Sequence, residues 1–320
     1  MSPTRWRRLD RLLERPVSTR PGGTARAQGA RPSGSSRGKP PPIHPFSPRA
    51  RATEQSLPEA DDIGPRRNES GTMRLALLTD LHANLEALEA VLEHARRQGG
   101  AEQFAFLGDL VGYGADPGPV VDRVQAAVAT GALAIKGNHD EATTRGAPQA
   151  MRSDAARVVT WTTEHLSREQ LAFLGGLPLS IEQGKRLFVH ASAVDPAQWI
   201  YVLSSVDAAR SLRAVRARQI FSGHTHTPGL YHLAANGSVG VFKPVPGTPI
   251  KLTAFHRWLV IPGSVGQPRD GNPAACYALL DDGTDVIVFH RVPYDAERAA
   301  RKIRAAGLPG DLGARLELGG

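Results

Sequence analysis

The fold is decided by the stretch at residues 73–97, MRLALLTDLHANLEALEAVLEHARR. Its first part, 74–79, is a mostly apolar run whose length suits a buried strand. The polar loop DLHAN follows at 80–84. The apolar residues of the remaining part recur at the spacing of one helix face: Leu85, Leu88, Val91 and Leu92. The stretch therefore predicts a strand, a polar loop and a helix.

The same order of strand and polar loop occurs twice more along the chain. A strand at 103–107 leads into GDLVGYGADP, and a helix is expected at about 119–129. A strand at 133–135 leads into KGNHDE. In open α/β sheets, ligands bind beyond the carboxyl ends of the strands, so we expect these polar loops to converge on one site.

The second half of the chain is rich in short strands. We expect strands at 186–189, 219–221, 229–233, 252–261, 276–280 and 285–291, and helices at 154–175 and about 207–215. Alternating strands and helices followed by a strand-rich half predict an α/β fold. We expect a four-layer α/β/β/α sandwich with two packed mixed sheets, and a site at the strand carboxyl ends.

Composition favours an ordinary packed domain. Of the 320 residues, 41% are hydrophobic and 22% are charged, which is near the usage of globular proteins. No run approaches the roughly 18 apolar residues of a membrane span, and the amino terminus lacks the apolar core of a secretory signal, so we expect a cytoplasmic protein without membrane contact. The single cysteine, Cys276, lies in an apolar run and is interpreted as a buried small side chain.

The basic charge is concentrated in residues 1–72. This segment holds 14 of the 39 basic, 7 of the 31 acidic and 11 of the 25 proline residues, so the remainder of the chain is nearly neutral. Its composition predicts a disordered extension. Because Met73 opens the first strand, a misassigned gene start is a second interpretation. A basic arm for nucleic acid is a third, but the seven acids dilute the charge.

Five polar segments carry the candidate site residues. Each follows or lies between predicted strands, and the residues are Asp80, His82, Asp109, Asn138, His139, Asp140, His190, His224 and His226. Carboxylate, imidazole and amide ligands without thiolate suit first-row ions such as Mn, Fe, Co, Ni or Zn. Two such ions at close range need a shared carboxylate, because their repulsion is large.

The motifs DLH, GDLVGYG, GNHD, VH and GHTH, in this order, resemble those of the calcineurin-like metallophosphoesterase family. The resemblance spans 73 to about 292. It is strongest to the small prokaryotic phosphodiesterases, which the segments at 107–117, 137–141, 223–228 and 262–270 echo. We therefore expect a metallophosphoesterase domain at 73–292, followed by a C-terminal helix and tail at 293–320.

The resemblance implies two divalent transition-metal ions. One would be held by Asp80, His82, Asp109 and His226, and the other by Asp109, Asn138, His190 and His224. The implied reaction is hydrolysis of a phosphodiester or phosphomonoester by a metal-bridging hydroxide, with a small phosphate ester as substrate. His139 would stabilise the transition state or protonate the leaving group, and Asp140 would orient its ring.

Two further residues are weaker candidates for substrate binding. Asn84 follows the first motif and could cap the next helix, contact the site, or do both. Arg269 lies in the segment PGSVGQPRD and could approach the substrate phosphate, although most loop arginines are simply solvated.

The sequence departs from some members of the family. Protein serine/threonine phosphatases and diadenosine tetraphosphatases usually carry an Arg where this chain has Gly114 and a Glu where it has Asp140, so they are less similar. Two alternative functions remain: a non-catalytic scaffold of the same fold, against which His139 argues, and a nuclease, which the near-neutral domain does not favour. The oligomeric state is not readable from these residues.

Overall fold

A computed structural model describes residues 73–147 and 153–320. The predicted extension at 1–72 lies outside the described residues. Two six-stranded mixed sheets and the helices around them confirm the predicted α/β fold class. No helix within the described ranges is long and apolar enough to cross a membrane.

The first sheet has the strand order β3, β2, β1, β11, β12, β9. The bounds in that order are Leu133–Ala134, Gln103–Phe106, Arg74–Leu78, Ala275–Asp281, Val286–Val292 and Ile250–Lys251. β1, β2 and β3 are parallel, whereas β11 is antiparallel to both β1 and β12. The carboxyl ends of three parallel strands therefore meet at one edge, as predicted.

The second sheet has the order β4, β5, β6, β10, β7, β8. The bounds in that order are Ser180–Gln183, Arg186–Val189, Gln219–Phe221, Arg257–Ile261, Gly229–Leu233 and Val239–Phe242. β5, β6 and β10 are parallel, and the outer strands pair antiparallel. The carboxyl ends of the neighbouring parallel strands β5 and β6 therefore also lie at one edge of this sheet.

The period of two along β1 separates two buried layers. Leu75 and Leu77 point into the core between the sheets, where they join Phe188 and Phe221 of the second sheet. Ala76 and Leu78 point to the outer face, into the core beneath the helices. Both faces of β1 are thus covered, which explains why its sequence is continuously apolar.

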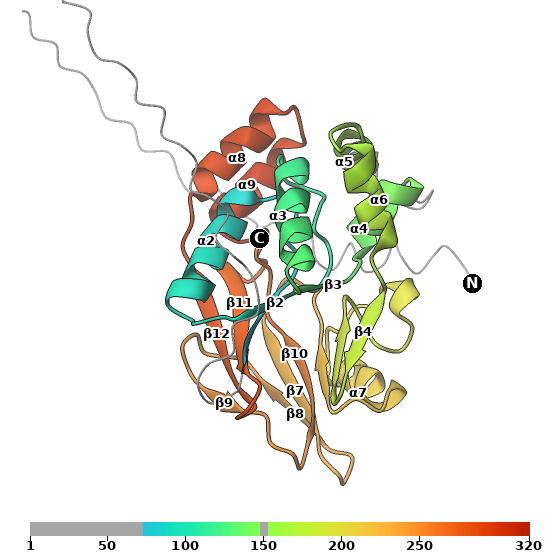
Figure 1. Cartoon of the computed structure of the whole chain (residues 1–320), viewed down its shortest axis with the longest axis vertical. Helices are drawn as coiled ribbons and strands as arrows, with labels where there is room; N and C mark the ends of the chain where they lie inside the picture. The colour runs from blue at the N-terminus through green and yellow to red at the C-terminus, as the bar shows by residue number, and fades with distance from the viewer. Residues whose placement is uncertain (1–72, 148–152) are drawn as a thin grey trace, which may run out of the picture. The chain divides into compact units, whose positions relative to one another are not determined.

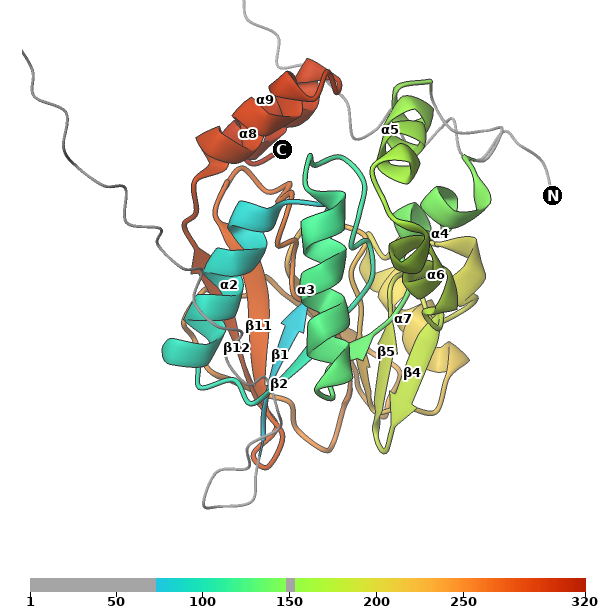
Figure 2. The same cartoon turned by 45° about the horizontal axis from the view of Figure 1, so that its top comes forward.

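Helices cover the outer faces of both sheets. α2 (Leu85–Arg97) and α3 (Pro117–Ala129) lie over the first sheet, as Figure 2 shows, and α7 (Ser205–Ala214) packs against the second. The other helices are α4 (Asn138–Arg145), α5 (Ser153–Glu164), α6 (Arg168–Gly176), the 3₁₀ turn η2 (Pro196–Gln198), α8 (Ala296–Ala305) and α9 (Gly310–Leu318). Figure 1 shows α5, α8 and α9 at the same end of the sheets.

Several predicted element boundaries were wrong. The helix expected at 154–175 is two helices, because Ser167 caps α6 in a capping box with Gln170. Within the strand expected at 252–261, only Arg257–Ile261 is extended. The end of the chain forms two helices rather than a helix and a tail, since α9 buries Leu312 and Leu316 against α8.

Candidate metal centre

The candidate site lies at the carboxyl ends of strands from both sheets. Asp80 and His82 follow β1, and Asp109 follows β2. Asn138 opens α4 after β3, His190 follows β5, and His224 and His226 follow β6. The two sheets therefore contribute to one centre, and the structure brings together all seven side chains expected as ligands.

The backbone at this centre is unusual. Five of these residues have positive φ angles: Asp80 (55°), His82 (48°), Asp109 (53°), His224 (70°) and His226 (60°). Such conformations cost about 1–3 kcal/mol each in a non-glycine residue and gather at functional sites. The close packing of the loops also requires glycine at 223, because a Cβ there would lie 1.9 Å from Thr79 Oγ1.

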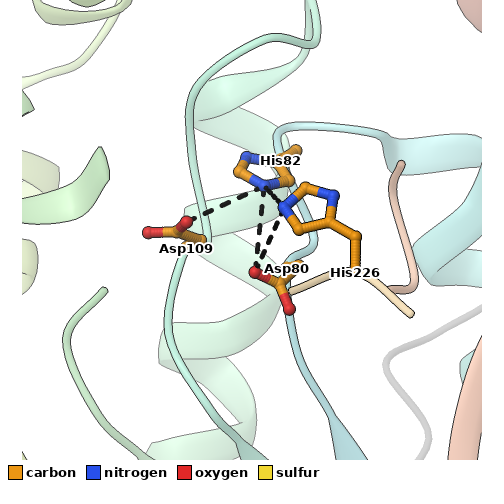
Figure 3. A group of neighbouring side chains, drawn as sticks. All are labelled: Asp80, His82, Asp109 and His226. Carbon is orange, nitrogen blue, oxygen red and sulfur yellow. Dashed lines mark hydrogen bonds and ion pairs between the residues drawn. The ribbon is translucent and has the colours of Figure 1, made fainter. Parts of the chain in front are cut away.

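Figure 3 shows the first group of side chains, Asp80, His82, Asp109 and His226. His226 Nε2 lies 3.4 Å from Asp80 Oδ1, and His82 Nε2 lies 3.8 Å from Asp109 Oδ2. The two imidazoles approach each other, with 3.0 Å between their Nε2 atoms. All four side chains are almost completely buried.

The second group shares Asp109 with the first and adds His190 and His224. His190 Nε2 lies 3.3 Å from Asp109 Oδ2 and 3.2 Å from Asn138 Oδ1. The His224 ring lies 5.0 Å from the His190 ring, centroid to centroid. Asp109 is the one carboxylate that belongs to both groups, so it is positioned to bridge two ions.

The donor atoms fit bound cations. His82 Nδ1 faces the Val111 carbonyl and His226 Nδ1 faces the Gln267 carbonyl, so each Nδ1 carries the hydrogen and each Nε2 presents a lone pair. These two lone pairs face each other at 3.0 Å. A cation between them would turn a repulsive arrangement into ligation.

The second group shows the same pattern. His190 Nδ1 faces the Leu107 carbonyl at 2.7 Å, which directs Nε2 towards the oxygens of Asp109 and Asn138. His224 Nε2 is buried and has no hydrogen-bond partner among residues 73–147 and 153–320. Two oxygens and two imidazole nitrogens thus surround the second position, as expected of a metal site.

The carboxylates are held by neighbouring donors. Asp80 Oδ2 accepts hydrogen bonds from Thr79 Oγ1 at 2.8 Å and from the His224 backbone N–H at 3.0 Å. Asp109 Oδ1 accepts a hydrogen bond from the His139 backbone N–H at 2.8 Å. Each carboxylate therefore keeps its other oxygen directed at the imidazoles.

Burial shifts the ionisation of the metal-free centre. It raises the pKa of Asp80 to about 7, with a further contribution from the charge of Asp109. Burial alone would lower the pKa of His190, but the carboxylates of Asp109 and Asp80 raise it to about 9. Burial lowers the pKa values of His82, His224 and His226 well below the usual value, so these rings are neutral and suited to ligation.

His139 lies beside the two groups but belongs to neither. Its ring is 5.0 Å from the His82 ring and 4.4 Å from the Tyr113 ring, and Nδ1 is buried without a partner among the described residues. Burial lowers its pKa, so the ring is neutral at pH 7. No hydrogen bond among the described residues therefore engages this ring.

Asp140 does not orient the His139 ring, contrary to the prediction. Its carboxylate accepts three backbone hydrogen bonds, from Leu110 at 2.9 Å, Val111 at 3.2 Å and Gly137 at 2.9 Å. Within the described ranges no hydrogen bond joins it to the imidazole of His139. Asp140 instead fastens the loop after β2 to the start of α4, since at position N3 its side chain points back along the helix.

Asn84 is a structural residue rather than a substrate contact. Its Oδ1 caps α2 by accepting a hydrogen bond from the Ala87 N–H at 3.1 Å, which confirms the predicted cap. Its Nδ2 donates to the Gly266 carbonyl at 2.8 Å and the Tyr294 hydroxyl at 3.1 Å. Both amide hydrogens and the oxygen are therefore used within the protein.

Three aromatic residues at the centre were missed by the sequence reasoning. Tyr113 packs on His82 with 4.6 Å between the ring centroids, and Tyr201 stacks on His224 at 3.8 Å. Trp199 lies 5.9 Å from His190. Tyr113 stands within the GDLVGYG motif and could have been noticed there, but nothing in the sequence near 199–201 indicates the site.

Comparison with known proteins places the chain among metallophosphoesterases. A family model described as the calcineurin-like phosphoesterase superfamily domain matches residues 73–285. The uncharacterized protein MJ0912 of Methanocaldococcus jannaschii is 36% identical over 251 residues, which are 77% of this chain and 98% of that protein.

Solved structures agree in fold. The crystal structure of a metallophosphoesterase from Sphaerobacter thermophilus has a TM-score of 0.69 and 35% identity, covering 78% of this chain and 100% of that one. The hypothetical protein PH1004 of Pyrococcus horikoshii OT3 has a TM-score of 0.64 at 21% identity, covering 77% and 98%, and supports the fold alone.

Proposed function

The chain belongs to the calcineurin-like phosphoesterase superfamily, and we propose that it hydrolyses phosphodiester or phosphomonoester bonds of small substrates with the help of two divalent metal ions. The observation that carries this proposal is the pair of Asp/His groups that share Asp109. One carboxylate shared between two buried sets of imidazoles is the ligand arrangement that a pair of neighbouring metal ions requires.

We assign the ligands as two sets. Asp80, His82, Asp109 and His226 would hold one ion, and Asp109, Asn138, His190 and His224 would hold the other. Two bound divalent ions supply a water of lowered pKa and offset charge on phosphoryl oxygens. Neutral imidazoles and an amide oxygen bind Mn, Fe, Co, Ni and Zn ions. The ion bound in the cell would then depend on which of these metals is available.

The protein itself would contribute orientation and a proton. The neutral His139 ring can donate a hydrogen bond to the oxygen of the leaving group and so stabilise the negative charge that develops there. Its backbone N–H meanwhile keeps Asp109 in the bridging orientation, at 2.8 Å from Oδ1. Asp140 acts indirectly as a positioning residue, because it holds the two loops that carry Asp109 and His139.

The test is hydrolysis of p-nitrophenyl phosphate and bis-p-nitrophenyl phosphate by purified protein supplied with Mn²⁺ or Ni²⁺. We expect turnover that requires the metal, and we expect Asn138→Ala to lose one of two bound ions. His139→Gln should keep both ions but lower kcat by about 10²–10⁴-fold, the usual contribution of a proton donor.

Metal binding without turnover of either ester would instead support the scaffold alternative. Loss of activity in His139→Gln together with loss of metal would contradict the separate role of His139.

A cytoplasmic location accords with this chemistry and remains part of the proposal.

A further inference from the structure

Arg269 lies beside the centre, and its positive charge forms no ion pair with another described residue. It lies in the loop between β10 and β11, and its backbone N–H donates to the His226 carbonyl at 3.3 Å. Two residues earlier, the Gln267 carbonyl accepts a hydrogen bond from His226 Nδ1 at 2.6 Å. These two bonds fix the loop, and so Arg269, relative to the metal-binding groups.

The guanidinium is held by neutral partners. Its Nε and Nη2 donate to Gln267 Oε1 at 3.3 and 2.8 Å, and it forms a hydrogen bond with Tyr113. Its Cζ also lies 5.7 Å from the centroid of the Tyr113 ring. No carboxylate lies within ion-pair distance of Arg269 among residues 73–147 and 153–320, whereas the adjacent Asp270 is paired with Arg291.

The charge of Arg269 acts on four imidazoles of the centre. After burial, which is the largest cause, the guanidinium further lowers the pKa values of His82, His139, His224 and His226. These imidazoles belong to both ligand groups and to the proposed proton donor. A cation that has no carboxylate at ion-pair distance among the described residues and lies near these imidazoles is well placed to attract an anion to the same space.

Two buried nitrogen atoms without partners accompany Arg269. Gln267 Nε2, an amide donor, is buried and has no hydrogen-bond partner in the described part of the chain, and the ring nitrogen His139 Nδ1 is also buried without a partner there. The Tyr113 ring lies 4.4 Å from the His139 ring and also carries the guanidinium, so it links Arg269 to His139. Buried donors without acceptors are costly, and a phosphate group supplies several acceptor oxygens.

We propose that Arg269, held by Tyr113 and Gln267, binds the non-bridging oxygens of the substrate phosphate and makes phosphomonoester dianions the preferred substrates. This inference rests on the proposed hydrolase function. The planar guanidinium matches two phosphate oxygens at once. A monoester carries a second negative charge near neutral pH, because its second pKa is about 6, so it gains more from this cation than a diester monoanion does.

The first test measures binding of inorganic phosphate to the metal-loaded protein by calorimetry. We expect Arg269→Gln to weaken phosphate binding by about ten- to a hundredfold, which is the usual effect of a charge-assisted hydrogen bond. Arg269→Lys keeps the charge but loses the planar guanidinium that can donate two parallel hydrogen bonds. Its phosphate affinity should lie between those of the parent protein and Arg269→Gln. The matched control is Arg301→Gln, an exposed arginine of α8, which should bind phosphate as the parent does.

The second test compares the two nitrophenyl esters. In Arg269→Gln, kcat/KM should fall at least tenfold more for the monoester than for the diester. Tyr113→Phe keeps the ring on His82 and His139 but removes the hydroxyl, so it should reproduce part of this selective loss. The losses of the Tyr113→Phe and Arg269→Gln variants should not add in the double variant, because both act through one guanidinium.

Unchanged phosphate affinity in Arg269→Gln, with two metal ions still bound, would overturn the inference, as would equal losses for both esters. Turnover that does not depend on Arg269 would leave the hydrolase function intact and remove this role alone. If Arg269→Gln weakened phosphate binding but the parent protein hydrolysed neither ester, the phosphate-binding role of Arg269 would stand and the proposed hydrolase function would be refuted.

Discussion

At the scale of single residues, Asp109 is the carboxylate that faces both ligand groups. Its Oδ2 lies 3.3 Å from His190 Nε2 and 3.8 Å from His82 Nε2, so it faces both ligand groups. Neighbouring imidazoles hold the pKa of Asp109 well below its usual range despite its burial. It therefore stays ionised and can offset the repulsion between two cations.

We predict that Asp109→Asn retains at most one metal ion per chain and loses at least about a hundredfold in kcat/KM. An amide is a weaker ligand and carries no charge to place between the ions. Metal content by mass spectrometry and the rate with p-nitrophenyl phosphate would measure both. Asp311→Asn, at an exposed residue of α9, is the matched control. Two tightly bound ions in Asp109→Asn would contradict the bridging role.

At the scale of elements, the C-terminal helices support the loops of the centre. Lys302 of α8 contacts Glu86 of α2 at 2.6 Å and Asp116, the residue before α3, at 2.9 Å. Asp116 closes the loop that carries Tyr113, and Tyr294 before α8 accepts the hydrogen bond from Asn84. α8 thus joins the first two motif loops from outside the region matched by the family model.

We predict that Lys302→Met lowers the free energy of unfolding by about 1–3 kcal/mol, because it leaves Asp116 without its cation in a half-buried position. Urea denaturation would measure the loss. Arg301→Met on the same helix should cost less than about 0.5 kcal/mol, since its ion pair is exposed. If the two variants were equally stable, the contacts of Lys302 would not contribute to stability.

At the scale of the whole domain, the centre joins the two sheets. The ligand candidates follow β1, β2 and β3 of the first sheet and β5 and β6 of the second. Bound ions would therefore connect segments from residue 80 to residue 226. Because metal binds the folded state preferentially, stability should rise with metal concentration.

Between about pH 7 and pH 9 the metal-free domain should lose stability as pH rises, because the imidazoles whose pKa values burial lowers are neutral in both the folded and the unfolded state there, and metal binding should release protons. Asp80 (pKa about 7, usual 3.8) and His190 (about 9, usual 6.5) bind more protons in the folded than in the unfolded state. Their contribution is lost as pH rises through these intervals. At pH 7.5 we expect Mn²⁺ binding to release protons, chiefly from His190, and Mn²⁺ affinity to increase up to about pH 9.

Calorimetry in two buffers of different ionisation enthalpy measures this proton release. His190→Ala should release fewer protons than the parent protein, whereas His165→Ala, at an exposed residue, should release as many. A binding enthalpy independent of buffer at pH 7.5 would contradict the predicted linkage.

Much of the fold could be predicted because its signals are local. The continuous apolar run at β1 and the helical spacing of α2 each lie within one short stretch. β4 and β8 were not predicted, since their residues are partly exposed edge-strand residues without a clear apolar pattern. The division between α5 and α6 was missed because a capping serine within a polar stretch is a weak signal.

The sequence by itself determined the strand–loop–helix that begins at Met73, the α/β class and the identities of the residues that could hold metal. Only the tertiary structure decided that Asp109 faces both groups, that Asn84 Nδ2 donates to Gly266 and Tyr294, that Asp140 binds backbone instead of the His139 ring, and that the Arg269 guanidinium lies over the Tyr113 ring. The physical reason is distance along the chain. Chemical identity and periodicity are properties of a segment, whereas the direction of a side chain at the centre depends on other segments, up to 182 residues away for Asn84.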